Sequence, residues 1–185
     1  LGYMRRELGY ELPDDLTRFR AFRRTRGAYT YLRLAGSTTT MAPDRLANAT
    51  SGTTVLDLTR VRFDASQTRP WLTYLEAART KVKSVQLMSA PLGFLEALVT
   101  PADLHDRVSV RSFALSYNCA RCETDTIEMI DVASNLEQLV EGTAPASRCP
   151  SCQSLLVATL SPELVGVIRS LPARERDPVL DNMLE

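Results

Sequence analysis

The sequence of 185 residues is poor in several features that mark enzymes and membrane proteins. It has a single histidine, His105, which we interpret as an exposed loop residue, and its eight glycines are scattered singly, so it contains no glycine-rich phosphate-binding loop. The formal net charge is zero, which removes the overall electrostatic case for binding nucleic acid or an anionic membrane. The longest mainly apolar run, residues 87–99, is short and contains Glu96, so no membrane span is predicted.

The overall composition is typical of a soluble globular protein. Hydrophobic residues make up 44% of the chain and charged residues 24%. This length accommodates one ordinary domain and a small additional module. No secretory signal is recognisable, and the cytoplasm is therefore the expected location.

All four cysteines of the chain fall into two C-x-x-C pairs, Cys119/Cys122 and Cys149/Cys152. In each pair, two thiolates from one tight turn lie close enough to bind the same ion. Residues 123–148 separate the pairs, and together the pairs supply the four sulfurs of a tetrahedral structural Zn²⁺ site. Because such a site has no open coordination position, we expect the metal to be structural and not catalytic.

Three other uses of the cysteines compete with zinc. Two disulfides would require an oxidising compartment. A thioredoxin-like redox motif normally occurs once, between a strand and a helix, and two pairs fit that pattern poorly. Iron held by four cysteines, as in rubredoxin, satisfies the same spacing, so the choice between zinc and iron stays open.

Residues 1–27 differ in composition from the rest and are predicted to form an N-terminal basic arm. Leu16, Phe19 and Phe22 lie at helical spacing. The basic side chains of this arm, a candidate interface, are Arg18, Arg20, Arg23, Arg24 and Arg26. One interpretation is an arm that docks on an acidic partner, RNA or an anionic membrane. The other, which we favour, is a solvated amphipathic helix lying on its own domain, because the acidic residues around it weaken the positive field.

Residues 28–113 are predicted to form an α/β domain, a sheet with helices packed on it. Strands and helices alternate in this region, which favours a largely parallel sheet. The expected strands are residues 29–34, 53–62, 82–89 and 108–117, and the expected helices are residues 66–80 and 92–99. On the first helix, Trp71, Leu72, Leu75 and Ala78 share one face and are expected to pack in the core.

This block resembles the STAS family, named for sulfate transporters and anti-sigma-factor antagonists. The features that carry the resemblance are Asp57 and Leu58 in a buried strand, Phe63 and Asp64 after it, and then an amphipathic helix, a strand ending in a small polar residue and a short helix. The resemblance implies a STAS-like sheet and a binding module of a bacterial signalling or assembly complex, not an enzyme.

The resemblance also assigns a role to one serine. In anti-sigma-factor antagonists, a serine of the Asp-Ser-Ser-Gly turn, at the N-terminus of the following helix, is phosphorylated by a partner kinase, and Ser66 resembles that position here. A phosphate there would face the positive end of the helix dipole. Ala65 and Gln67 depart from the family pattern, however, and the plainer interpretation is that Ser66 caps the helix.

The remaining residues form two further segments. Residues 114–160 are predicted to be a small β-rich zinc ribbon, in which a strand at 124–132 pairs back on 112–117 and residues 155–160 form a closing strand. In residues 161–185, Ser161 and Pro162 are typical of a helix start, and a charged tail follows Pro172.

Two functions follow from this organisation. The first is a non-enzymatic adaptor that binds other proteins within a larger complex, with the zinc ribbon as a structural accessory. The second is a nucleic-acid-associated regulator that uses the ribbon and the N-terminal arginines to contact phosphates. Only Arg121 is basic inside the two cysteine pairs, which favours the adaptor.

Overall fold

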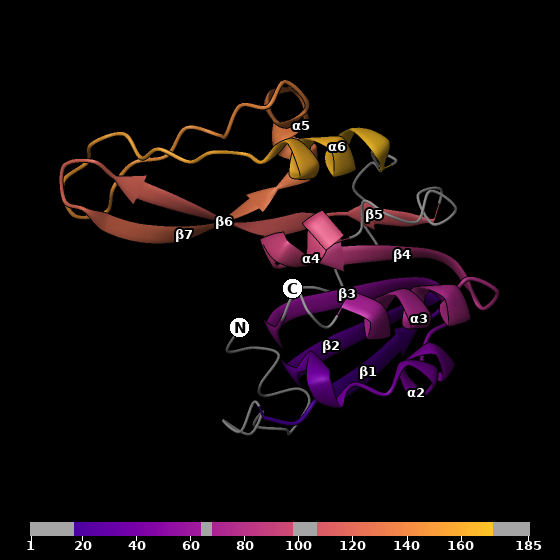
Figure 1. Ribbon diagram of the computed structural model, residues 1–185. Coiled ribbons are helices and arrows are strands. Elements are labelled where there is room, and N and C mark those ends of the chain that lie inside the picture. Colours follow the sequence, from indigo (N-terminus) through magenta and orange to yellow (C-terminus); the bar gives the residue numbers. More distant parts are fainter. Residues whose placement is uncertain (1–16, 64–67, 98–106, 172–185) are drawn as a thin grey trace.

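The computed structural model describes residues 17–63, 68–97 and 107–171, which form two β-sheets with helices packed against them (Figure 1). The elements of the first sheet and its helices are β1 (Arg20–Arg26), β2 (Tyr29–Ser37), η1 (Thr38–Thr40), α2 (Pro43–Asn48), β3 (Gly52–Arg62), α3 (Thr68–Ala78), β4 (Val82–Met88), α4 (Leu92–Ala97) and β5 (Val108–Val110). The elements that follow are β6 (Ser112–Cys119), β7 (Thr124–Asp131), α5 (Val132–Val140) and α6 (Pro162–Ser170). The expected α/β architecture with a mainly parallel sheet is confirmed.

The larger sheet has the strand order β1-β2-β3-β4-β5, with β2 to β5 parallel and β1 antiparallel to β2. The helix predicted around Phe19 and Phe22 is therefore wrong, because residues 20–26 form an edge strand that belongs to the sheet. The hairpin decides this outcome: Gly27 has a φ of 56° and closes a tight turn that pairs Arg26 with Tyr29. Long-range pairing overrides the local helical spacing.

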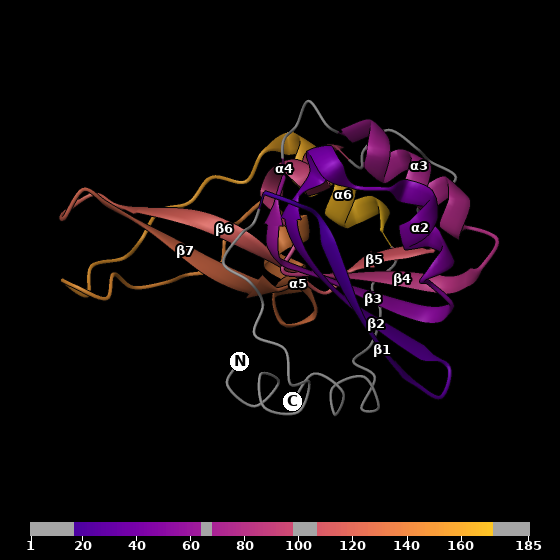
Figure 2. The ribbon, with the colours of Figure 1, turned by 90° about the horizontal axis from the view of Figure 1, so that it is seen from below.

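One face of this sheet is apolar, and helices α2, α3 and α4 lie over it (Figure 2). Leu32 and Leu34 of β2 and Leu56 and Leu58 of β3 point to this face and are buried. Alternate residues of a strand point to opposite faces, so the regular spacing of these leucines makes a continuous apolar layer. The layer forms the core against which the helices pack.

Trp71 of α3 lies at the centre of that core, as predicted, and is 1% exposed. Its ring makes edge-to-face contacts with Phe94 of α4, Phe19 and Tyr74, at centroid distances of 4.8, 6.0 and 6.1 Å. Leu72, which was expected on the same face, is only half-buried. The aromatic contacts thus join two helices and the segment before β1.

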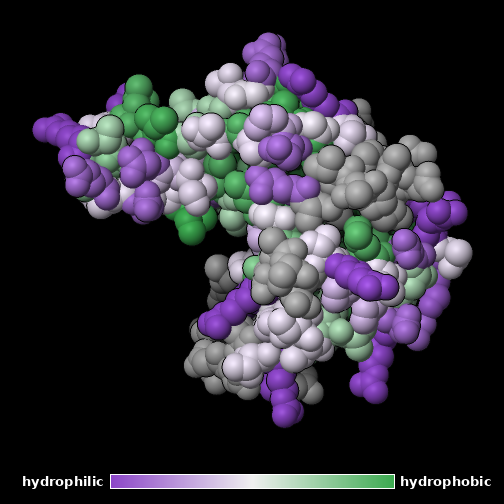
Figure 3. All heavy atoms as spheres, viewed as in Figure 1, coloured by the Kyte–Doolittle hydropathy of each residue, from purple (hydrophilic) through white to green (hydrophobic). Residues whose placement is uncertain are grey.

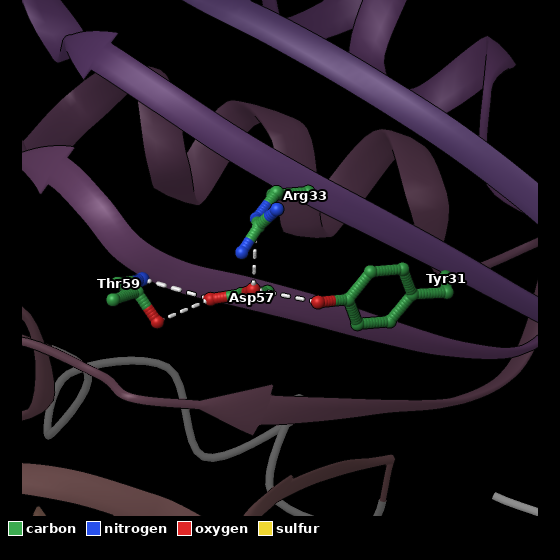
Figure 4. A network of polar contacts seen from close by, with 4 residues as sticks. All are labelled: Tyr31, Arg33, Asp57 and Thr59. Atoms are coloured by element: carbon green, nitrogen blue, oxygen red, sulfur yellow. Dashed lines mark hydrogen bonds and ion pairs between the residues drawn. The ribbon is translucent and has the colours of Figure 1, made fainter. Parts of the chain in front are cut away.

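The opposite face of the sheet carries a buried polar network (Figure 4). Tyr31 donates a hydrogen bond of 2.6 Å to Oδ2 of Asp57, and the backbone N–H and hydroxyl of Thr59 donate to Oδ1 at 3.0 and 2.6 Å. Nε of Arg33 lies 3.5 Å from Oδ2. Asp57 is 2% exposed, so these donors replace the water that its carboxylate would otherwise bind.

The two sheets are joined at β5 and β6. The single strand predicted for residues 108–117 is interrupted at Arg111, whose N–H bonds to Leu87 and whose carbonyl accepts from Val132. After this break, β6 pairs antiparallel with β7 over its whole length, as predicted from the sequence. One cluster of buried residues continues from the larger sheet into β6, α5 and α6, and the boundary predicted after residue 113 falls inside β6.

The segment after the second cysteine pair differs from its prediction. Residues 155–160 were expected to form a closing strand, but only isolated bridges form there, between Arg148 and Leu155 and between Asn118 and Val157. The helix start at Ser161 is confirmed, because its hydroxyl accepts a hydrogen bond of 3.1 Å from the N–H of Leu164. None of the helices in the described ranges has the length and apolar composition needed to cross a membrane.

Candidate metal centre

The four cysteines that the sequence singled out come together at the tip of the β6–β7 hairpin. Their sulfur atoms all lie within 4.8 Å of one another. Sγ of Cys119 and Sγ of Cys152 are 3.5 Å apart, far more than the ~2.05 Å of a disulfide bond, and all four cysteines are free. Cys119 and Cys149 are fully buried, while Cys122 and Cys152 are partly exposed. This arrangement could hold one metal ion among four sulfurs.

The two cysteine pairs use the same backbone turn. The residue after each pair, Glu123 or Gln153, has a positive φ, 55° and 60° respectively. The N–H of Glu123 bonds to the carbonyl of Cys119 at 2.8 Å, and the N–H of Gln153 bonds to that of Cys149 at 2.9 Å. The left-handed conformation costs energy in residues other than glycine. Its occurrence at the same place in both pairs indicates two equivalent metal-binding turns.

Hydrogen bonds at the cluster change the acidity of its thiols unequally. The backbone N–H groups of Cys152 and Ser151 lower the pKa of Cys149. The Ser154 side chain is the main cause that lowers the pKa of Cys152 to about 6. The hydrogen bond with Cys152 is the main cause that raises the pKa of Cys122 to about 12, because it favours the protonated thiol. Four adjacent thiolates repel one another, and a bound cation is what allows such a set to ionise together.

Several contacts hold the second pair against the hairpin. The N–H of Cys149 bonds to the carbonyl of Ser154 at 2.9 Å. Asn118 and Val157 exchange two backbone hydrogen bonds of 2.8 and 2.9 Å. Farther from the metal centre, the hydroxyl of Tyr117 donates to the carbonyl of Pro145 at 2.8 Å, and Ser147 donates to Glu128. The loop that carries the second pair is therefore fixed on both sides of its cysteines.

The predicted arginine interface is divided by the strand. Arg20, Arg24 and Arg26 point to one face of the sheet, because they pair with Ala35, Tyr31 and Tyr29, while Arg23 pairs with Leu32 on the other face. Arg18 precedes the strand. The register of β3 adds Arg60 and Arg62 to the face that holds Arg20, since these residues pair with Ala35 and Ser37. Residues 20–26 of the predicted arm thus form an edge strand that contributes to a basic sheet face, and residues 1–16 of the arm lie outside the described residues.

Two residues considered from the sequence cannot be placed. Ser66, the candidate phosphorylation site, and His105 both lie outside the described residues. One buried feature, the network around Asp57, was not predicted from the sequence. An aspartate in the middle of an apolar strand was the available signal, but its partners Tyr31 and Arg33 become apparent only from the pairing of β2 with β3.

Comparison with known proteins adds no assignment. No family model, no curated protein and no solved structure matches this chain significantly. Function is therefore inferred from the chemistry of the cysteine cluster and from the surfaces around it.

Proposed function

We propose that this chain is a non-enzymatic protein-binding adaptor, in which a STAS-like α/β sheet carries a lobe held together by a structural zinc ion. We define the metal lobe as residues 112–160. The single observation that carries the proposal is the gathering of all four thiols within 4.8 Å. A metal coordinated by four sulfurs has no position left for water or substrate, so its role is to hold the lobe in shape.

The spacing of the sulfurs is compatible with zinc. With Zn–S bonds of about 2.3 Å, the sulfurs of a tetrahedral site are separated by about 3.8 Å. The 3.5 Å between the sulfurs of Cys119 and Cys152 and the upper limit of 4.8 Å for the whole set bracket that value. Backbone N–H groups directed at Cys149 are a further feature of thiolates that serve as metal ligands. Iron fits the same ligands, and metal analysis distinguishes the two.

The order of the elements supports the comparison with the STAS family. The strand with Asp57 and Leu58 is β3, and it is followed by the amphipathic helix α3, by β4 with Ser89 directly after it, and by the short helix α4. This is the order that the resemblance implies. Because that family consists of binding modules, we assign the chain a role in assembling other proteins, in a bacterial signalling or assembly complex in the cytoplasm.

Two measurements test the proposal. Elemental analysis of the purified chain is expected to return one zinc per chain, and Cys149→Ser is expected to lower this content sharply. Substitution of the metal by Co²⁺ is expected to give the absorption of a tetrahedral four-sulfur site. A metal-free protein, or thiols oxidised in pairs, would refute the metal assignment. For the adaptor role, affinity capture with the wild type is expected to recover a partner protein, and repeated recovery of none would refute it.

A second function is favoured by one observation, the basic sheet face. It combines the exposed Arg20, Arg26 and Arg62 with the half-buried Arg60, which makes a stripe suited to the phosphates of nucleic acid. In a gel-shift assay, Arg20→Gln/Arg26→Gln would weaken binding and reduce the salt dependence by about one unit of slope per lost contact. The control, Arg23→Gln/Arg45→Gln, removes the same charge outside that face. Absence of binding at low salt would refute this function.

A further inference from the structure

The metal lobe exposes an unusual amount of apolar side chain. Within the described parts of the chain, the exposed large hydrophobic residues are Ile127, Met129, Leu155 and Val157, and all four belong to this lobe. Their exposed fractions are 71%, 49%, 63% and 61%. Figure 3 shows apolar surface gathered over the projecting lobe. Single exposed apolar residues are common on proteins, but four on one small lobe require an explanation.

Strand register places these side chains on one face. Ile127 pairs with Ser116 and Met129 with Ala114, and directly paired residues of antiparallel strands share a face. Val157 forms an antiparallel bridge with Asn118, which belongs to the same face of β6. Leu155 shares the side of Val157, because burial alternates along this segment and the intervening Leu156 is buried. We call this surface the outer face of the lobe.

Rows of short and large side chains alternate across the outer face. Its central row, on β6, consists of the short side chains of Ala114, Ser116 and Asn118. A row with Ile127 and Met129 lies on one side of it, and Val157 lies on the other side. A large row can therefore pack over the small row of an identical face turned around a two-fold axis, which is how isologous interfaces are built. Charged residues border these rows: Asp125 pairs with Asn118 and Asp131 pairs with Ser112 at the two ends of the hairpin, and Arg148 bridges to Leu155.

The area agrees with what a stable dimer needs. At their exposed fractions, the four side chains present on the order of 400 Å² of apolar surface, within the range of about 300–600 Å² for the largest patch on a monomer, which is often functional. Two copies would bury about 800 Å² of apolar surface, and at an apolar share of about 56–65% the whole interface would reach roughly 1,200–1,400 Å². That total lies within the range of about 1,200–2,000 Å² for specific complexes. We propose that the outer face binds a second copy of this chain, giving a two-fold symmetric dimer through the metal lobe.

Sheet-on-sheet packing of the two outer faces is the expected contact. Antiparallel sheets pack with their strands at about 30° and bring the side chains of both inner faces together. The chain has zero net charge, so the two copies do not repel each other over longer distances. The proposal needs the lobe to be folded, but it does not depend on which metal is bound.

The test is the mass of the metal-loaded chain in solution, measured by light scattering and sedimentation over a range of concentrations. The wild type is expected to be a dimer. Ile127→Thr/Val157→Thr keeps β-branched side chains on the outer face and is expected to weaken dimerisation at least tenfold. Ala21→Ser/Ala146→Ser makes exposed alanines polar elsewhere and is expected to leave the dimer unchanged.

Two results would overturn the proposal. One is a wild-type chain that stays monomeric up to the highest attainable concentration, including one that instead binds a different protein through this face. The other is a dimer that is equally stable in the Ile127→Thr/Val157→Thr variant. Metal content is measured on the same samples. A monomer with a full complement of metal would refute the dimer alone, whereas a metal-free chain would refute the metal site.

Discussion

Strands β3 and β7 show how differently the two parts of the molecule are stabilised. In β3, five consecutive residues, 54–58, are buried, so side chains on both faces of the strand are covered. In β7, only Ile130 is buried among eight residues. Its partner β6 buries Phe113, Leu115 and Tyr117 in the cluster that continues from the larger sheet, and the low burial is therefore confined to β7 and the tip of the hairpin. The larger sheet is thus stabilised by its core, whereas β7 and the tip of the hairpin have few buried side chains and are expected to depend on the metal.

Removal of the metal is expected to have the largest effect and to separate the two parts. In small zinc-binding peptides the ion contributes on the order of 10 kcal/mol, far more than any single side chain of the lobe. Chelation, or Cys119→Ser, is expected to expose residues 118–156 to protease while residues 20–63 and 68–97 stay protected. Limited proteolysis with mass spectrometry measures this.

Restoring the metal to the chelated wild type, but not to Cys119→Ser, is expected to restore protection. Unchanged resistance of residues 118–156 after verified loss of the metal would show that packing alone stabilises the lobe. The lobe would then not differ from the larger sheet in needing a metal.

The complementary change removes core volume from the larger sheet. Trp71→Ala deletes the side chain that contacts Phe19, Tyr74 and Phe94, and such substitutions cost about 3–5 kcal/mol. The free energy of unfolding in urea measures the loss, and the metal content in the absence of urea is expected to stay normal. Leu72→Ala, on the same helix but half-buried, is the control and is expected to cost clearly less. Equal losses would contradict the assigned core.

A smaller effect is expected at the buried carboxylate. Tyr31→Phe removes the hydroxyl that donates to Asp57 at 2.6 Å and leaves a buried acceptor with one donor fewer, at a cost of about 1–3 kcal/mol. Burial, and next the charge of Asp57, raise the pKa of Tyr31 above its usual value of 10. Just above pH 10, the phenol of Tyr31 therefore stays protonated in the folded state but ionises in the unfolded chain.

Tyr31 thus contributes stability that is fully present below pH 10 and is lost as the pH rises above that value. Urea unfolding on both sides of this pH is expected to show a shallower alkaline loss of stability in Tyr31→Phe than in the wild type. Parallel curves would show that the hydroxyl is not buried beside the carboxylate.

The smallest effects are expected at the two metal-binding turns. Glycine adopts a positive φ without strain, so Gln153→Gly is expected to change stability by less than about 1 kcal/mol, because strain relief and the gain in unfolded-chain entropy oppose each other. Arg121 is exposed and has a negative φ, so Arg121→Gly relieves no backbone strain. It is therefore expected to weaken metal retention more than Gln153→Gly does. Competition with a chelator measures retention. Identical losses of metal retention in both variants would contradict the strained positive φ of Gln153.

Local sequence patterns were sufficient for the features that depend on neighbouring residues. The C-x-x-C spacing predicted the cysteine cluster, and the apolar spacing of α3 predicted the burial of Trp71. Ser161 and Pro162 predicted a helix start, because capping depends on residues within one turn.

The features that were missed depend on which strands lie side by side. Residues 20–26 have helical spacing, but pairing with β2 makes them a strand. The partners of Asp57, and the placement of Ile127 and Val157 on one face, likewise follow from the pairing register of the strands. One amino-acid sequence does not reveal that register by itself. The assignment of 155–160 as a strand failed because alternation alone does not supply a neighbour to pair with.

The separation of the two cysteine pairs along the chain has a consequence for synthesis on the ribosome. Residues 123–148 lie between the pairs, so at about 5–20 residues per second the first pair is made roughly one to five seconds before the second. During that interval the nascent chain offers only two sulfurs, which bind metal less tightly than four and are open to oxidation. Correct loading must therefore wait for Cys152, and a cell that pauses translation between the pairs would lengthen the period in which this protein is most easily damaged.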